Sequence, residues 1–271
     1  MIGARDPYWG VLTHDRFRSV NLTPAAIEEF YESGRTEIQR TVDVLHQLGG
    51  EPFAPDVAVD FGCGVGRLSF AMTQYARRVL GVDVADSMLD VARRQASERG
   101  IANLELQVAL PSTGADWVNS VIAFQHIPPD RGQLLFDALI DLLNPGGYVS
   151  LHLTFFRDRR HTGDVQRDLG EYRYDGNVVE LLSAASDAAG CIAMYDYDLN
   201  RAFRALFMSG VESVRVDHTD HGGCHGVMLY GRRRFHDSGT AVDPTVPAEA
   251  SHRSGRTLSR LRRRVRRSWG D

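Results

Sequence analysis

The chain has 271 residues, of which 43% are hydrophobic and 24% are charged, and its mean hydropathy is -0.27. These values are typical of a globular protein with a sizeable core, and they exclude a collagen-like or fully disordered chain. No apolar run reaches the about 18 residues that a transmembrane helix needs. Because the N-terminus also lacks the basic and apolar segments of a secretory signal, the sequence predicts a cytoplasmic protein.

Charge is concentrated at one end of the chain. Arginine supplies all 31 cationic residues, and the formal net charge is -4. Residues 251–271 hold eight arginines and one aspartate, so this tail carries +7 and the rest of the chain carries -11. The three cysteines, Cys63, Cys191 and Cys224, lie far apart and form no CxxC pair, which indicates free thiols.

The first 50 residues are predicted to form a helical cap. Residues 21–34 favour a short helix, because Thr23 suits the N-cap, Pro24 suits the first helical position and Gly34 can end the helix. A second helix is predicted from Arg35 to Leu48, where apolar residues recur at helical spacing before two glycines.

From residue 57 onward, short apolar runs alternate with amphipathic segments, as in a parallel sheet flanked by helices. The predicted strands are residues 57–61, 79–83, 104–108, 118–124, 148–153, 211–216 and 227–232. The predicted helices are residues 67–76, 87–99, 131–143, 178–189 and 198–209. A polar run within 154–177 is too long for a simple connection and indicates an inserted lid or loop.

The first predicted strand ends in a glycine-rich turn, Gly62-Cys63-Gly64-Val65-Gly66. Glycines let a ligand approach the backbone closely, and free N–H groups at a helix start favour an anionic group. The second strand ends at Asp83, whose carboxylate can accept hydrogen bonds from both ribose hydroxyls of a nucleoside. A dinucleotide fingerprint needs a glycine where Arg67 stands, so the spacing favours another nucleoside cofactor.

These segments resemble the class I S-adenosylmethionine-dependent methyltransferases. The resemblance is carried by residues 60–67, 81–89, 121–128 and 143–148, which occur in the family's order. It implies an α/β fold with a Rossmann-like, seven-stranded, mostly parallel sheet and an antiparallel last strand. The methyltransferase domain would then span residues 51–234, including the insert.

The resemblance also implies which residues hold S-adenosylmethionine. Asp60 would favour the ammonium group, Asp83 would hold the ribose, and Val84 and Met88 would sandwich the adenine. The full set of implied cofactor residues is Asp60, Gly62, Cys63, Gly64, Asp83, Val84, Met88, Phe124 and Gln125. The family often has an acidic residue after the third strand, whereas residues 107–111 contain none.

Histidines provide the candidate catalytic groups. His126 follows the fourth strand at the ligand-binding edge of a parallel sheet, where an imidazole can remove a proton; the alternative is that it only orders the loop. His218 and His221 belong to a polar cluster, residues 217–225, between the last two strands. The cluster can bind a polyol, act as a base or hold a metal, or it can be a plain solvated hairpin.

Residues 235–271 are predicted to be a linker and an arginine-rich tail. Within residues 253–267, apolar side chains recur on one helical face and arginines surround them, as in helices that contact an anionic membrane or an acidic partner. A disordered tail is the plainer interpretation. The acidic body shows no nucleic-acid-binding module, so no nucleic acid partner is predicted.

The sequence therefore predicts a methyltransferase that acts on a hydroxyl of a small molecule or saccharide. The segment Asp6–Leu12 and the turn at His221 are similar to bacterial methyltransferases linked to saccharide assembly. The alternatives are an N- or C-methyltransferase of a natural-product precursor, and a nucleotide-binding module without turnover.

Overall fold

The computed structural model describes residues 5–50, 52–158, 172–174, 179–181 and 194–235. The chain divides into two compact units, Met1–Arg234 and Phe235–Asp271, and of the second only Phe235 is described. The predicted basic helix at residues 253–267 and Cys191 lie outside the described residues. Among the described residues, no helix is both long and apolar enough to span a membrane.

One seven-stranded sheet organises the first unit, in the order β3-β2-β1-β4-β5-β9-β8. The pairings among β1 to β5 are parallel, whereas β9 pairs antiparallel with both β5 and β8. This arrangement confirms the predicted mostly parallel sheet with an antiparallel last strand. The strands are β1 (Val57–Phe61), β2 (Arg78–Val82), β3 (Leu104–Gln107), β4 (Ala115–Ser120), β5 (Leu143–Arg157), β8 (Val211–Asp220) and β9 (Cys224–Arg233).

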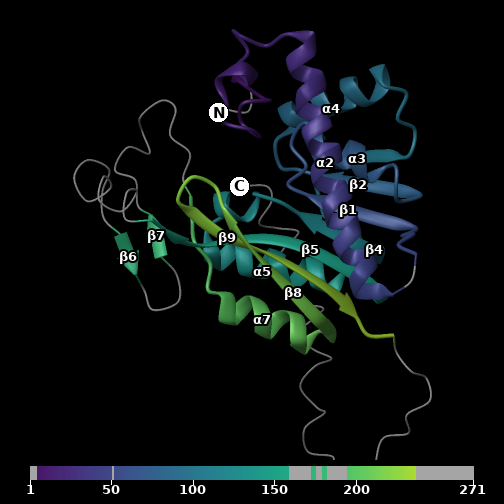
Figure 1. Cartoon of the computed structure of the whole chain (residues 1–271), viewed down its shortest axis with the longest axis vertical. Helices are drawn as coiled ribbons and strands as arrows, with labels where there is room; N and C mark the ends of the chain where they lie inside the picture. Colours follow the sequence, from purple (N-terminus) through teal and green to yellow (C-terminus); the bar gives the residue numbers. More distant parts are fainter. Residues whose placement is uncertain (1–4, 51, 159–171, 175–178, 182–193, 236–271) are drawn as a thin grey trace, which may run out of the picture. The chain divides into compact units, whose positions relative to one another are not determined.

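Helices connect and cover these strands, and Figure 1 shows α2 lying across the sheet. A separate two-stranded hairpin pairs β6 (Tyr172–Tyr174) with β7 (Val179–Leu181). The helices are η1 (Asp15–Phe17), α2 (Pro24–Gly49), α3 (Arg67–Met72), α4 (Asp86–Glu98), η2 (Phe124–His126), α5 (Pro129–Asp141) and α7 (Leu199–Met208).

The prediction of two N-terminal helices is wrong, because α2 is one helix of 26 residues. Its start is as expected: the hydroxyl of Thr23 accepts a hydrogen bond from the amide of Ala26 at 3.2 Å. Gly34 does not end the helix. It lies inside α2, where a side chain would overlap the backbone carbonyl of Arg67, so the glycine allows α2 to cross the start of α3 closely.

Three further predictions of element boundaries and types need correction. β5 continues to Arg157, so residues 154–157 belong to the sheet and not to the insert. The helix expected over residues 178–189 is wrong at Val179–Leu181, which form a strand. The fourth strand ends at Ser120, and the expected strand residues 121–124 instead lead into the turn η2.

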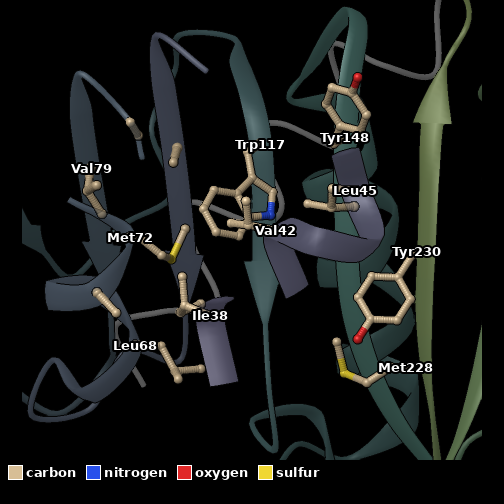
Figure 2. Close-up of a cluster of buried hydrophobic side chains, with 13 residues drawn as sticks. Ile38, Val42, Leu45, Leu68, Met72, Val79, Trp117, Tyr148, Met228 and Tyr230 are labelled. Atoms are coloured by element: carbon tan, nitrogen blue, oxygen red, sulfur yellow. The ribbon is translucent and has the colours of Figure 1, made fainter. Parts of the chain in front are cut away.

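The core on one face of the sheet joins α2 and α3 to the strands. In Figure 2, Val42 and Leu45 of α2 lie beside Trp117 of β4 and Tyr148 of β5. On the opposite face, Phe124 packs its ring against Phe61 of β1 and Phe136 of α5, with centroids 5.6 and 5.7 Å away. Both faces are therefore covered, and ligand access is left to the edge where the parallel strands end.

Candidate active site

The glycine turn after β1 is held against the end of β2. The amides of Gly62 and Cys63 donate to the carbonyl of Val82 at 2.8 and 3.1 Å. Gly62, Gly64 and Gly66 have φ angles of 76°, 54° and 85°, a backbone region that side chains disfavour. A side chain at Gly62 would also overlap Ala123, so the turns after β1 and β4 meet at this point.

Asp83 lies at the end of β2 and binds this turn. Its two carboxylate oxygens accept hydrogen bonds from the amides of Gly64 and Ala85, both at 2.9 Å. Burial raises the pKa of Asp83, and these amide contacts oppose that rise. Each oxygen keeps a further acceptor position, which suits the two hydroxyls of a ribose.

Apolar side chains border the same turn. Met88 of α4 is buried, whereas Val84 is 62% exposed. A methyl group added at Gly64 would come 3.0 Å from Val11 and 3.5 Å from Met88, so the N-terminal segment lies against the glycine turn. Cys63 is buried, and its sulfur faces the position where Gly81 would carry a side chain. Its contribution to the turn is therefore its backbone.

Asp60 belongs to a buried polar network that crosses three strands. Its carboxylate accepts from Ser69 at 2.5 Å and from Asn119 at 2.9 Å. The network continues from Asn119 to Ser150 at 2.7 Å and from Ser150 to the indole of Trp117 at 2.9 Å. Burial raises the pKa of Asp60 to about 6, although Ser69 and Asn119 favour the ionised form.

The turn after β4 carries the predicted base. Ile122 has a φ of 59°, which is an outlier for a β-branched residue. The ring of Phe124 is fully buried in the core, so only its backbone faces the turn. The side-chain nitrogen Nε2 of Gln125 lies 3.1 Å from Nε2 of His126, and His126 is exposed.

His152 is a functional candidate that the sequence interpretation missed. It lies on β5, only 1% exposed, with Nε2 2.9 Å from the hydroxyl of Thr219 and its ring 5.5 Å from that of His221. Burial, with a smaller contribution from His221, lowers the pKa of His152 to about 4. The alternation Ser150, His152, Thr154 in an otherwise apolar strand is a signal that points to this face.

The predicted histidine cluster of residues 217–225 is divided between two sets of contacts. His221 lies beside His152, whereas Nε2 of His218 lies 3.1 Å from Nδ1 of His225. Asp220 accepts a hydrogen bond from the amide of Gly223 at 2.6 Å and stabilises the hairpin turn. Within the described ranges, no three His, Cys, Asp or Glu side chains are grouped to hold a metal ion.

Two regions of the strand-end edge can now be distinguished. The cofactor end comprises the glycine turn 62–66, Asp83 and Met88. The acceptor end comprises His152, the β8–β9 hairpin and the end of β5. The turn Ile122–Ile127 lies between them in the strand order, because β4 separates β1 from β5.

Comparisons with known proteins agree with this geometry. Residues 58–147 match the family described as a methyltransferase domain. Aklanonic acid methyltransferase of Streptomyces is 30% identical over 140 residues, 48% of this chain and 59% of that protein. A ubiquinone biosynthesis O-methyltransferase of Leptothrix cholodnii is 35% identical over 34% of this chain and 42% of its own length. The chain thus spans about half the length of these relatives.

A solved structure supports the same fold. Magnesium protoporphyrin IX methyltransferase from Synechocystis, with bound SAH, has a TM-score of 0.54 and 16% identity to this chain. The similarity covers 83% of this chain and 99% of that structure. Residues 58–147 are thus similar to a methyltransferase domain, and the fold is similar to that of a solved methyltransferase.

The residues at this strand edge fit S-adenosylmethionine, the cofactor that the resemblance implies. The close meeting of the turns at Gly62 and Ala123 brings backbone to the strand ends, which suits a ligand held against the main chain. The Asp83 carboxylate is fixed by two amides and retains acceptor capacity for a ribose. Met88 and Val84 supply apolar surface for the adenine ring. The individual ligand roles of these residues remain predictions.

Proposed function

We propose that this methyltransferase transfers a methyl group from S-adenosylmethionine to a hydroxyl oxygen of a small molecule or saccharide. The observation that carries the proposal is the order of the strand ends. The Asp83 and glycine-turn site lies on β1 and β2, the turn bearing His126 follows β4, and the histidines of the acceptor end lie on β5 and the β8–β9 hairpin. Donor site, base and acceptor region therefore follow one another along one edge.

S-adenosylmethionine, when bound, supplies an electrophilic methyl group. The chain's own residues then have three tasks: to hold the cofactor, to orient the acceptor and to remove a proton. Asp83 holds the ribose, and the backbone of Gly62 and Gly64 carries the amino-acid end. Fixing two reactants in line lowers the barrier by roughly 7 to 11 kcal/mol in well-oriented systems.

His126 is the proposed base. Its imidazole is exposed beside Gln125, in a turn that is itself fixed to the sheet, so it can reach an acceptor at the strand ends. A well-placed base contributes about 10²- to 10⁴-fold to the rate of a reaction that needs proton removal. His152 differs from His126 because it is only 1% exposed, and burial lowers the pKa of His152 to about 4.

The polar character of the acceptor end supports a hydroxylated substrate. Thr219, His221 and Asp220 present hydroxyl, imidazole and carboxylate groups, which recognise polyols through hydrogen bonds. A relative named ubiquinone biosynthesis O-methyltransferase matches part of this chain, and its name is consistent with transfer to oxygen. An N- or C-methyltransferase of a natural-product precursor is the second candidate, and it would need less from His126.

A methyl-transfer assay with labelled S-adenosylmethionine against saccharides, phenols, small alcohols and amines tests the proposal. We expect label in a hydroxylated acceptor and micromolar binding of S-adenosylhomocysteine by calorimetry. Binding without transfer to any acceptor would favour the nucleotide-binding module. Transfer to amines alone would contradict the hydroxyl proposal and favour the second candidate.

A further inference from the structure

We infer that residues Tyr195–Tyr197, called the strap here, set the conformation of the turn Ile122–Ile127, with Tyr197 as a positioning residue for methyl transfer. The inference deepens the proposed function and rests on it. The strap lies in sequence just before α7, far from the motifs that identify the family. Its contacts, described below, reach the turn that bears Gln125 and His126.

The hydroxyl of Tyr197 bridges two carbonyls of the turn. It lies 3.0 Å from the carbonyl oxygen of Phe124 and 2.7 Å from that of Ile127. Its ring packs edge-on against Phe124, with centroids 5.8 Å apart, and the residue is 7% exposed. The buried hydroxyl thus contacts both the first and last parts of the turn, and its one hydrogen is shared between the two carbonyls. The carbonyl of Phe124 also accepts from the amide of Ile127 at 2.9 Å. Loss of one such hydrogen bond typically costs about 0.5–1.5 kcal/mol.

A second bond holds the middle of the turn. The amide of Tyr195 donates to the carbonyl of Gln125 at 2.7 Å. The strap is itself fixed to β5, because the hydroxyl of Thr154 donates to the carbonyl of Tyr195 at 2.8 Å and the amide of Tyr197 donates to the carbonyl of Thr154 at 2.7 Å. The turn is therefore connected through the strap to a buried strand.

The turn has a conformation that needs such support. Ile122 adopts a φ of 59°, and a β-branched residue in this region carries strain of order 1–3 kcal/mol. Strain of this size persists only where surrounding contacts fix the backbone. The start of α5 leaves space for the Tyr197 hydroxyl, because a side chain at Gly132 would overlap it.

The strap and the cofactor site use different contacts. Tyr195 and Tyr197 bond to the turn and to Thr154, whereas Asp83 bonds to Gly64 and Ala85. Loss of the Tyr197 hydroxyl should therefore change the placement of Gln125 and His126 and leave the contacts of Asp83 and the glycine turn intact. A general loss of folding would instead affect both.

The test is Tyr197→Phe, which keeps the buried ring and removes only the hydroxyl. We expect kcat to fall about tenfold and amide hydrogen exchange of residues 123–127 to rise about tenfold, the size of one buried hydrogen bond. The KM for S-adenosylmethionine and the Kd for S-adenosylhomocysteine should change by a smaller factor than kcat, because the contacts of Asp83 and the glycine turn are kept and only those implied for Phe124 and Gln125 are disturbed. Tyr75→Phe is the matched control, since the Tyr75 hydroxyl bonds to Gln39 on α2, away from the turn.

Thr154→Val provides a second variant if Tyr197→Phe folds poorly. It removes the hydroxyl that fixes Tyr195 and leaves Tyr197 intact, so exchange in the turn should rise by a smaller factor. Two results would contradict the proposed role of the strap. One is unchanged hydrogen exchange at residues 123–127 in the folded variants, and the other is raised exchange with unchanged kcat. Failure of the parent protein to methylate any acceptor overturns the proposed function instead, and the exchange measurement separates the two results.

Discussion

The cofactor end and the acceptor end are built from different kinds of contact. At the cofactor end, Asp83 bonds to Gly64 and Ala85, residues 19 and two positions away along the chain. At the acceptor end, His152 meets Thr219 across 67 positions and Arg157 meets Asp196 across 39. The cofactor end is formed by strands and turns that lie close together in the sequence. The acceptor end forms only when β5, β8, β9 and the strap assemble together.

Because of this difference, substitutions at the cofactor end should mainly weaken ligand binding, and substitutions at the acceptor end should mainly lower the free energy of unfolding. The local contacts of the cofactor end leave acceptor capacity at Asp83 for a ligand. The long-range contacts of the acceptor end include a buried ion pair and a buried imidazole, whose energetic value depends on the intact fold. Variants at the two ends should therefore fail in different ways, and the following experiments measure that difference.

The largest effect is expected from Asp196→Ala at the acceptor end. The Arg157–Asp196 pair is 3.1 Å long, with side chains only 4% and 3% exposed. Removing Asp196 leaves the guanidinium buried without its counter-ion, which costs about 3–5 kcal/mol in the free energy of unfolding. The matched control is Asp56→Ala, because the Arg77–Asp56 pair is exposed and should contribute less than about 1 kcal/mol. Equal urea midpoints for the two variants would contradict this contrast.

Asp60→Asn should change how stability depends on pH. Because the folded pKa is raised from 3.8 to about 6, the folded state binds more protons than the unfolded state between these values. The parent's free energy of unfolding therefore loses about 3 kcal/mol from this group as pH rises across the window. Asn cannot titrate, so the variant-minus-parent difference should increase by about that amount from pH 4 to 7 in urea unfolding. A constant difference would refute the raised pKa.

His152→Gln should give the opposite slope. The folded pKa of His152 is lowered from 6.5 to about 4, so the unfolded state binds the extra proton in this range. The parent then loses about 3 kcal/mol of stability from this group as pH falls from 6.5 to 4. The variant lacks that loss, and its difference from the parent should rise on acidification. A constant difference would place His152 in a solvated environment with an ordinary pKa, and a difference that rises toward neutral pH would mean that the folded state favours the imidazolium.

The same contrast explains how far the sequence could be interpreted. The glycine turn and Asp83 were accessible because they follow from short motifs, and the mostly parallel sheet with its antiparallel last strand followed from the resemblance that those motifs carry. The continuity of α2 through Gly34 could not be predicted from the sequence, because the glycine is explained by the close approach of Arg67 from another helix. His152, Thr154 and the strap likewise depend on pairing between segments that are far apart in the chain. The polar alternation on β5 was the one local signal for them.

Asp83→Ala tests the cofactor end by itself. Two hydroxyl donors to a carboxylate should make the Kd for S-adenosylhomocysteine rise about 30-fold, or about 2 kcal/mol, in calorimetry. Asp86→Ala is the matched control, because Asp86 lies exposed in the first turn of α4. The free energy of unfolding should change much less than in Asp196→Ala. An unaltered Kd for S-adenosylhomocysteine would contradict the proposed contact between Asp83 and the ribose.

His126→Ala tests the boundary between the two ends and should have the smallest energetic effect. Loss of a base predicts at least a tenfold lower kcat, about 1.4 kcal/mol, with the Kd for S-adenosylhomocysteine nearly unchanged. His46→Ala is the control, because His46 lies exposed in the last turn of α2. If His126 is the base, the variant should also lose the acidic limb of the pH–kcat profile, whereas a residue that only orders the turn would lower kcat at every pH equally. An unaltered rate and profile would assign proton removal to the acceptor end, where His218 and His221 are exposed imidazoles.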